Sequence, residues 1–286
     1  MKINRISLSS LAVAILLVLP LLVETVQADP VRCAGCKTEH FLIQHLAAPY
    51  EALSGVKLLP GGSGNKKAIL LFVDGKINFA YTCKPHVKLA KKFKLDPAAT
   101  ANWVSTAIAK DPIVVVANSG CGITDLTLDQ LKGIFSGSIQ NWNEVGGADL
   151  PIIVAHLDDS VESGVVTVFK ETTVGAKANL NPLAKKLKSP PQLGSFAKAT
   201  AGATTFMGLN SYEDKFGTLV SINGANPDVA NVVNGSYPLS VTYHVVYDPT
   251  QSSEAEGFLG FCATQQGQDL INEMMVAIPQ KNVVLP

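Results

Sequence analysis

The stretch LTLDQLKGIFSGSIQNWNEVGG, residues 126–147, is the part of the sequence that is most informative about the fold. It predicts a helix from Thr127 to Phe135, with Thr124 or Asp125 placed to cap the helix N-terminus. The short apolar run at residues 152–155 then predicts a strand. A helix followed directly by a strand is typical of an α/β protein.

The same alternation of helix-like and strand-like segments extends to both sides of this stretch. Helices are predicted at residues 41–53, 66–73, 163–170 and 257–275, and strands at residues 56–59, 77–81, 113–117 and 241–247. Residues 61–64 are expected to form a tight turn, and residues 185–193, which contain Ser189-Pro190-Pro191, an exposed loop. The sequence therefore predicts an α/β fold.

The composition and charge of the chain argue against a surface that binds nucleic acid or an anionic membrane. The 286 residues include 23 basic and 23 acidic side chains, so the formal net charge is zero. Such a balance does not indicate a nucleic-acid or anionic-membrane surface. Arg5 and Arg32 are the only arginines in the chain, and the lysines at positions 88, 91, 92 and 94 are interpreted as a solvated face.

The first 28 residues have the pattern of a secretory signal peptide. Lys2 and Arg5 precede the apolar run 11–23, and Val26-Gln27-Ala28 is a small-residue cleavage site that leaves Asp29 as the first mature residue. The apolar run is shorter than the roughly 20 residues that a membrane span requires. We therefore expect a cleaved leader and a periplasmic protein.

The cysteines leave several interpretations open. Export places them in an oxidising compartment, and their odd number leaves at least one thiol unpaired, metal-bound or bridged between chains. The Cys33-x-x-Cys36 motif suits a structural disulfide, a redox-active dithiol or a soft-ligand site. Lys37 stands where a haem attachment motif has histidine. The other cysteines are Cys83, Cys121 and Cys262, of which the last two are either a disulfide or separate thiols.

Four segments together resemble the phosphate-type solute-binding proteins of ABC transporters. They are residues 126–147, residues 61–65 with 73–80, residues 234–240 and residues 258–270. The resemblance covers nearly the whole predicted mature chain. It implies the two-lobe fold of periplasmic binding proteins, type II, with a hinge and an interlobe cleft. The first lobe would hold residues 29–118 with 237–286, and the second would hold residues 119–236.

The resemblance also implies where an anion would bind. Turn amides and helix N-termini hold oxyanions in such proteins. The positions that correspond to family anion contacts are Cys36 and Thr38 at the first helix, Gly62, Ser63 and Gly64 in the tight turn, Cys83 after the second strand, and Ser163 with Gly164 at the second-lobe helix. Two polar family positions, at Cys36 and Cys83, have therefore become cysteine.

The second-lobe loop, residues 156–166, departs from the family pattern. It has no arginine, although bidentate arginine contacts supply much of the specificity of phosphate sites. It holds Asp158, Asp159 and Glu162 instead, which would repel a dianion. His40 and His156 are expected near the cysteines, and Cys33, Cys36, Cys83 and His86 form a candidate metal set.

From these features we expect a binding protein and not an enzyme. Its ligand would be a small inorganic anion, its partner an ABC permease or a sensor kinase domain, and its state a monomer without a resident cofactor or nucleic acid. One alternative is a receptor for a metal or a metalloid such as arsenite, bound by the cysteines. The other is a thiol-disulfide oxidoreductase that uses Cys33 and Cys36.

Overall fold

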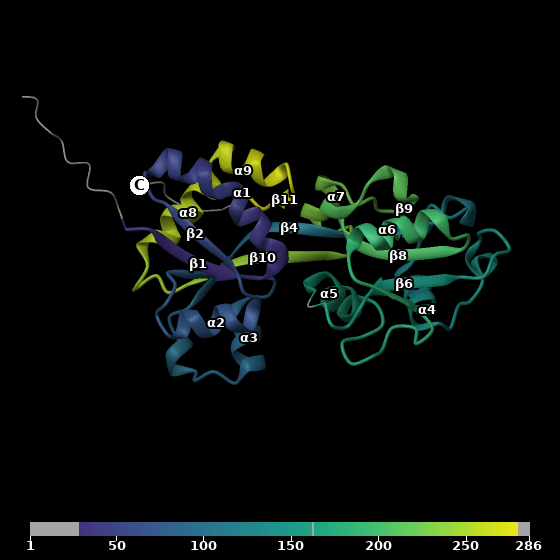
Figure 1. Ribbon diagram of the computed structural model, residues 1–286, viewed down its shortest axis with the longest axis horizontal. Helices are drawn as coiled ribbons and strands as arrows, with labels where there is room; N and C mark the ends of the chain where they lie inside the picture. The colour runs from purple at the N-terminus through teal and green to yellow at the C-terminus, as the bar shows by residue number, and fades with distance from the viewer. Residues whose placement is uncertain (1–28, 162, 280–286) are drawn as a thin grey trace, which may run out of the picture.

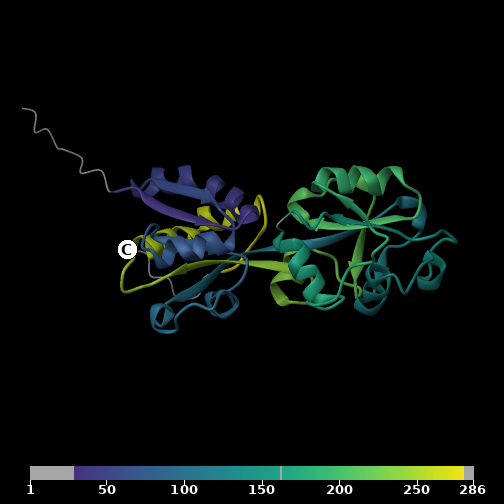
Figure 2. The same cartoon turned by 60° about the horizontal axis from the view of Figure 1, so that its bottom comes forward.

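The computed structural model describes residues 29–161 and 163–279, which form two α/β lobes side by side (Figures 1 and 2). The N-terminal elements and the C-terminal helices share one lobe, and the middle of the chain forms the other. The predicted two-lobe α/β fold is confirmed. The predicted signal peptide lies outside the described residues, and the exact lobe boundaries stay a prediction. Among the described helices, none is long and apolar enough to cross a membrane.

The first lobe is a small sheet with helices packed on it. Strand β1 lies between β2 and β3 and is parallel to both, so the carboxyl ends of all three strands share one edge. The elements are β1 (Val31–Gly35), α1 (Lys37–Ser54), β2 (Leu58–Gly62), α2 (Asn65–Val73), β3 (Phe79–Thr82) and α3 (His86–Phe93), with α8 (Ser253–Ala263), α9 (Gln265–Asn272) and β11 (Val276–Ala277).

Two long antiparallel strands, β4 (Val104–Ala117) and β10 (Ser240–Tyr247), join the lobes. The first part of β4 pairs with β10, and its last residues pair with β8 and β9. Only residues 113–117 of this strand were predicted. The missed part, residues 104–112, mixes polar with apolar residues and therefore lacks the continuous apolar pattern of a buried strand.

The second lobe continues the sheet in the order β4-β8-β6-β7. Its elements are β5 (Asp125–Leu126), α4 (Leu128–Ser136), β6 (Ile153–Leu157), α5 (Gly164–Thr172), β7 (Lys185–Leu187), α6 (Pro190–Ala199), β8 (Ala203–Gly208), β9 (Thr218–Ile222) and α7 (Val229–Asn234). Phe169 of α5 stacks on Phe206 of β8 with ring centroids 3.7 Å apart, and Phe135 of α4 packs edge-on against both. This cluster holds α5 against the sheet.

Three local predictions need correction. Residues 185–193 are not a loop but contain β7 and the start of α6, because Pro190 and Pro191 occupy the first turn of that helix, where proline is tolerated. Residues 257–275 are two helices and not one, since the Thr264 hydroxyl accepts the Gly267 amide and starts α9. The cap of α4 is Thr127 rather than Thr124 or Asp125.

Candidate functional site

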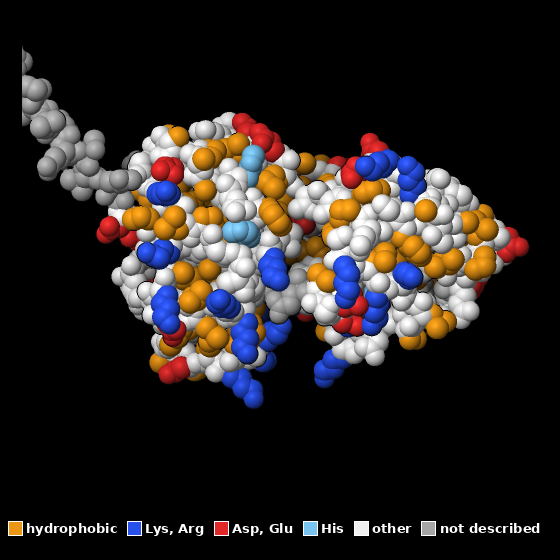
Figure 3. Space-filling model, viewed as in Figure 1, with side chains coloured by type: hydrophobic (Ala, Val, Ile, Leu, Met, Phe, Trp, Pro, Cys, Tyr) orange, Lys and Arg blue, Asp and Glu red, His pale blue; other side chains and the backbone are white. Residues whose placement is uncertain are grey.

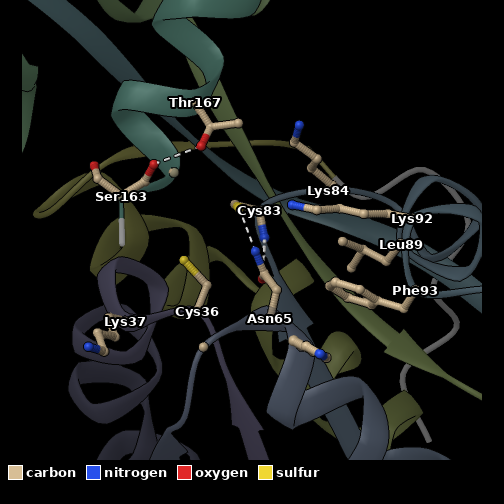
Figure 4. A pocket seen from close by; sticks show the side chains of 13 residues that line it. Cys36, Lys37, Asn65, Cys83, Lys84, Leu89, Lys92, Phe93, Ser163 and Thr167 are labelled. Carbon is tan, nitrogen blue, oxygen red and sulfur yellow. Dashed lines mark hydrogen bonds between the residues drawn. The ribbon is translucent and has the colours of Figure 1, made fainter. Parts of the chain in front are cut away.

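A cavity of about 440 Å³ lies between the lobes (Figure 4). The first lobe supplies one wall from α1, α2, α3 and the end of β3, and the second lobe supplies the other wall from the start of α5. The cavity is lined by Cys36, Lys37, Gly64, Asn65, Lys66, Cys83, Lys84, Leu89, Lys92, Phe93, Ser163, Gly164 and Thr167.

Three helices begin at this cavity. Cys36 is the N-cap of α1, Gly64 is the N-cap of α2 and Ser163 is the N-cap of α5. The Ser163 hydroxyl accepts the Val166 amide at 3.3 Å. Because each helix N-terminus carries partial positive charge, the three together favour an anion at their meeting point.

Glycines allow the first-lobe turn to pack tightly. Gly64 has φ +78°, in the left-handed region that glycine adopts without strain. A Cβ on Gly35 would lie 1.8 Å from the Tyr81 carbonyl oxygen, so only glycine fits there. The Gly35 carbonyl accepts the Ser63 amide at 3.1 Å and the Gly64 amide at 2.8 Å. These two turn amides, which we expected to face the anion, are therefore engaged within the lobe.

The structure brings together only part of the predicted anion contacts. Cys36, Gly64, Cys83, Ser163 and Gly164 line the cavity. The predicted donors Gly62 and Ser63 precede Gly64 in the turn, and the Ser63 hydroxyl is buried without a hydrogen-bond partner among the described residues. Thr38 is the second residue of α1 and is half-buried.

Four lysines line the cavity, and sequence reasoning missed all of them as site residues. They are Lys37, Lys66, Lys84 and Lys92. Figure 3 shows basic side chains on both sides of the hollow between the lobes. The signal was present in the sequence, since three of these lysines lie within two residues of Cys36, Gly64 or Cys83. Lys92 belongs to the lysine run that was predicted to be solvated; it is exposed as expected, and it also lines the cavity.

Lys84 also connects the lobes. Its Nζ forms an ion pair with Glu171 of α5, which belongs to the opposite lobe. Nearby, a Cβ on Gly164 would lie 3.2 Å from the Cys83 Sγ, so the start of α5 rests directly on this thiol. The two lobes are therefore in contact beside the cavity.

The Cys83 thiol has an unusual environment. It is 6% exposed, and its Sγ accepts a hydrogen bond from Asn65 Nδ2 at 3.0 Å. A hydrogen bond from the Cys36 thiol, aided by Asn65 and the charge of Lys84, lowers the pKa of Cys83 to about 6. The same hydrogen bond, together with burial, raises the pKa of Cys36. The pair thus consists of one readily ionised thiol and one that stays protonated.

A buried carboxyl group lies close to this pair. Glu39 of α1 is fully buried, and neither of its carboxylate oxygens has a hydrogen-bond partner among the described residues. Burial, and then the charge of Cys83, raise the pKa of Glu39 well above its ordinary value. Burial therefore favours the protonated, uncharged form of this carboxyl group beneath the cavity.

The structure brings Cys36 next to Cys83, two cysteines that the sequence analysis grouped only as candidate ligands of a metal or metalloid. All five cysteines are free, so neither Cys33–Cys36 nor Cys121–Cys262 is a disulfide in this structure. Cys36 interacts with Cys83 because β1 and β3 are adjacent and parallel, with Gly35 opposite Tyr81. The sequence motif Cys-x-x-Cys suggested the nearer partner along the chain instead.

The candidate metal set is not assembled. Cys33 is a buried strand residue of β1, and His86 is engaged with the Ser105 hydroxyl through its amide at 2.8 Å and its Nδ1 at 2.7 Å. Within residues 29–161 and 163–279, no group of three or more His, Cys, Asp or Glu side chains could hold a metal ion.

Two histidines expected near the cysteines have other partners. His40 Nδ1 lies 2.8 Å from the Tyr81 hydroxyl, and its ring stacks on the Tyr81 ring. His156 is buried on β6, where its Nδ1 lies 2.7 Å from the Leu157 carbonyl oxygen.

The acidic loop does not oppose an anion in the way we expected. Asp158 pairs with Lys188 at 3.0 Å and Asp159 pairs with Lys186 at 2.5 Å. Hydrogen bonds from Ser160, and then Lys188, lower the pKa of Asp158, which keeps that carboxylate ionised and paired. Both aspartates line a second hollow, of about 270 Å³. Glu162 lies outside the described residues.

Comparison with known proteins identifies relatives. Residues 24–266 match the family described as the PBP superfamily domain. The phosphate-binding protein PstS of Bacillus subtilis (strain 168) is 27% identical over 168 residues, which cover 59% of this chain and 55% of that protein. PstS of Borreliella burgdorferi is 22% identical over 184 residues, which cover 59% of this chain and 63% of that protein. The matches thus span little more than half of the length of these relatives.

Solved structures show the same fold. An ABC-type phosphate transport receptor from Vibrio cholerae superposes with a TM-score of 0.72 at 23% identity, over 87% of this chain and 100% of that chain. A putative phosphate ABC transporter substrate-binding protein with bound phosphate, from Clostridium perfringens, superposes with a TM-score of 0.68 at 24% identity. The superposition covers 87% of this chain and 100% of that chain.

Proposed function

The chain belongs to the PBP superfamily, and on this premise we propose that it captures a small inorganic oxyanion of the phosphate type between its two lobes. Its role is binding and release, not catalysis. The relatives named above as phosphate-binding proteins and the solved phosphate receptors support this choice of ligand.

The observation that carries the proposal is the meeting of three helix N-termini and four lysines at one cavity. Helices α1, α2 and α5 begin there, and Lys37, Lys66, Lys84 and Lys92 line it. Helix amides and lysine ammonium groups both stabilise negative charge. Because α5 belongs to the opposite lobe, an anion held by all three helices draws the lobes together.

Lysines replace the arginine that the family pattern has in the second-lobe loop. An ammonium group acts as a point charge, whereas a guanidinium group forms two parallel hydrogen bonds with an oxyanion. Electrostatic attraction is therefore retained, and geometric selection among oxyanions is weaker. The ion pairs of Asp158 with Lys188 and of Asp159 with Lys186 partly offset the repulsion that the sequence suggested.

An ABC permease is the partner that we propose for release of the anion. The solved receptors with this fold include an ABC-type transport receptor. The pattern of residues 1–28 predicts export, so the proposed place of action is the periplasm.

Calorimetric titration of the mature chain with inorganic phosphate tests the proposal. We expect saturable binding of one anion, weakened about tenfold by Lys92→Gln because a positive charge leaves the cavity wall. Lys91→Gln is the matched control, since Lys91 is the exposed neighbour on the same helix, and its effect is expected to stay within about twofold.

An absence of phosphate binding by the folded wild-type chain would contradict the proposal. Equal effects of the Lys91 and Lys92 substitutions would place the anion elsewhere on the surface. Circular dichroism of each variant confirms that a lost signal comes from the site and not from unfolding.

A further inference from the structure

We propose that Cys36 and Cys83 are a reversible dithiol–disulfide pair inside the cavity, and that forming the disulfide strengthens oxyanion binding. The first half of this proposal concerns the two thiols alone. The second half rests on the proposed function.

The backbone places the two thiols side by side. Gly35 of β1 lies opposite Tyr81 of β3 in a parallel pairing, and the Cys36 amide donates to the Tyr81 carbonyl at 3.0 Å. Cys36 and Cys83 therefore leave the same edge of the sheet on neighbouring strands. Figure 4 shows both sulfur atoms directed into the same space at the cavity.

The two thiols differ in the way that disulfide exchange requires. Cys83 accepts hydrogen bonds from Cys36 and from Asn65 and lies next to the charge of Lys84, and each of these contacts stabilises its thiolate. The thiolate is the attacking species in thiol–disulfide exchange. Cys36 keeps its proton and is positioned to attack second.

The co-reactant is a disulfide compound, and an anionic one suits the lysine-lined cavity. The Cys83 thiolate attacks one sulfur of the disulfide R–S–S–R, which breaks its S–S bond and releases RS⁻. The Cys36 sulfur then attacks the Cys83 sulfur of the mixed disulfide and displaces the second RS⁻, and the Cys36 proton passes to a released thiolate. The pair loses two electrons to the disulfide compound, and the products are the Cys36–Cys83 disulfide, RSH and RS⁻.

Oxidation changes the charge of the cavity. In the reduced protein the Cys83 thiolate adds a negative charge beside the start of α5, at the point where an oxyanion would contact both lobes. Like charges at such a distance repel, and burial weakens the screening by salt. The disulfide is neutral, so the charge of the Cys83 thiolate no longer opposes the attraction of Lys37, Lys66, Lys92 and the helix N-termini for the anion.

The pair is tested on the mature chain equilibrated with glutathione and glutathione disulfide at graded ratios. Free thiols are alkylated, and the protein is digested without reduction. Mass spectrometry should then find a peptide linking Cys36 to Cys83 whose amount follows the ratio. Cys33→Ala should retain this linkage, although Cys33 is the nearer cysteine along the chain, whereas Cys36→Ser should lose it.

Phosphate affinity is then measured on both forms of the wild-type protein. We expect the oxidised form to bind phosphate about tenfold or more tightly than the reduced form at pH 8. Cys83→Ser, which has no thiolate at this position, should bind like the oxidised form in either redox buffer. Thermal denaturation verifies that each sample is folded.

The outcomes separate the two halves of the proposal. The absence of a Cys36–Cys83 peptide at every ratio overturns the redox pair. A Cys36–Cys83 disulfide that leaves the phosphate affinity unchanged overturns the proposal that oxidation strengthens oxyanion binding. If neither form binds phosphate, the proposed function fails, and the mass-spectrometric result still decides whether the pair exists.

Discussion

At the scale of single residues, Cys83 differs from the other four thiols in its surroundings. Burial raises the pKa of Cys33, Cys121 and Cys262, which lie in apolar environments. Cys83 is also buried, but hydrogen bonds from Cys36 and Asn65 outweigh its desolvation. Hydrogen bonding to the charged form thus decides the direction of the pKa shift of Cys83, whereas burial is the largest cause of the raised pKa of Cys33, Cys121 and Cys262.

This difference predicts how alkylation of Cys83 depends on pH. The rate with iodoacetamide should rise with a midpoint near pH 6, because the thiolate reacts and the pKa is lowered to about 6. In Asn65→Ala the midpoint should move up toward the ordinary value of 9.0, because a donor that stabilises the thiolate is lost. Peptide mapping by mass spectrometry follows Cys83 separately. A wild-type midpoint near 9 would contradict this account.

At the scale of one element, helix α4 begins within one residue of its predicted start, and its contacts show why the wrong cap residue was chosen. The Thr127 hydroxyl accepts the Gln130 amide at 3.1 Å, and the Thr127 amide donates to Gln130 Oε1 at 2.8 Å, which completes a capping box. Asp125, an alternative cap, accepts the Gly224 amide at 2.8 Å instead. Several residues before a helix can serve as its cap, and the true one is identified by its reciprocal contacts.

The cap predicts a stability difference between two neighbouring threonines. Thr127→Ala should lower the free energy of unfolding by about 1 kcal/mol, because the amides of the first turn lose their acceptor. Thr124→Ala serves as the control and should change it by less than about 0.5 kcal/mol, since Thr124 is exposed. Urea denaturation measures both. Equal losses in the two variants would show that Thr127 does not act as the cap.

At the scale of the whole molecule, the connection between the lobes contains a buried acid. Asp111 lies on β4 opposite Val241 of β10 and is fully buried, and the Leu209 and Asn210 amides and the Tyr243 hydroxyl only partly offset the cost of burying its charge. Burial raises the pKa of Asp111 to about 7. A Cβ on Gly208 would lie 2.5 Å from Asp111 Oδ2, so glycine makes room for this carboxyl group where the strands cross between lobes.

Asp111 therefore predicts a pH dependence of folding stability. Its pKa is about 7 in the folded protein and 3.8 ordinarily, so the folded state holds an extra proton between these values. The stability that Asp111 contributes is fully present below about pH 4. It is lost as the pH rises toward 7, by at most about 1.4 kcal/mol for each pH unit. In Asp111→Asn this contribution should be absent.

Guanidinium denaturation of both proteins at pH 5 and pH 8 measures the difference. Wild type should lose stability relative to the asparagine variant as the pH rises. Comparing the two proteins cancels other titrating groups, including Cys83, whose lowered pKa contributes stability that is lost as pH falls through about 6. The same pH dependence in both proteins would show that Asp111 is not the responsible group.

Much of the fold and part of the site could be predicted from the sequence. Apolar periodicity and turn residues located most of the helices but fewer than half of the strands, and the helices predicted from residues 66 and 163 correspond to α2 and α5, which begin one residue away from these positions. These signals depend on residues only a few positions apart. The place of Lys92 on the cavity wall was missed because exposure alone does not tell whether a side chain faces open solvent or a cavity shared with another lobe.

The sequence by itself determined the α/β class, the positions of α2 and α5, and the departure from arginine in the second-lobe loop, because local spacing and composition carry that information. Only the tertiary structure decided that Cys36 meets Cys83 and not Cys33, that four lysines surround one cavity, and that Asp158 and Asp159 are paired elsewhere. These outcomes depend on the register of β1 against β3 and on the contact of α5 with the first lobe. Such contacts join residues far apart in the chain, and no local pattern specifies them.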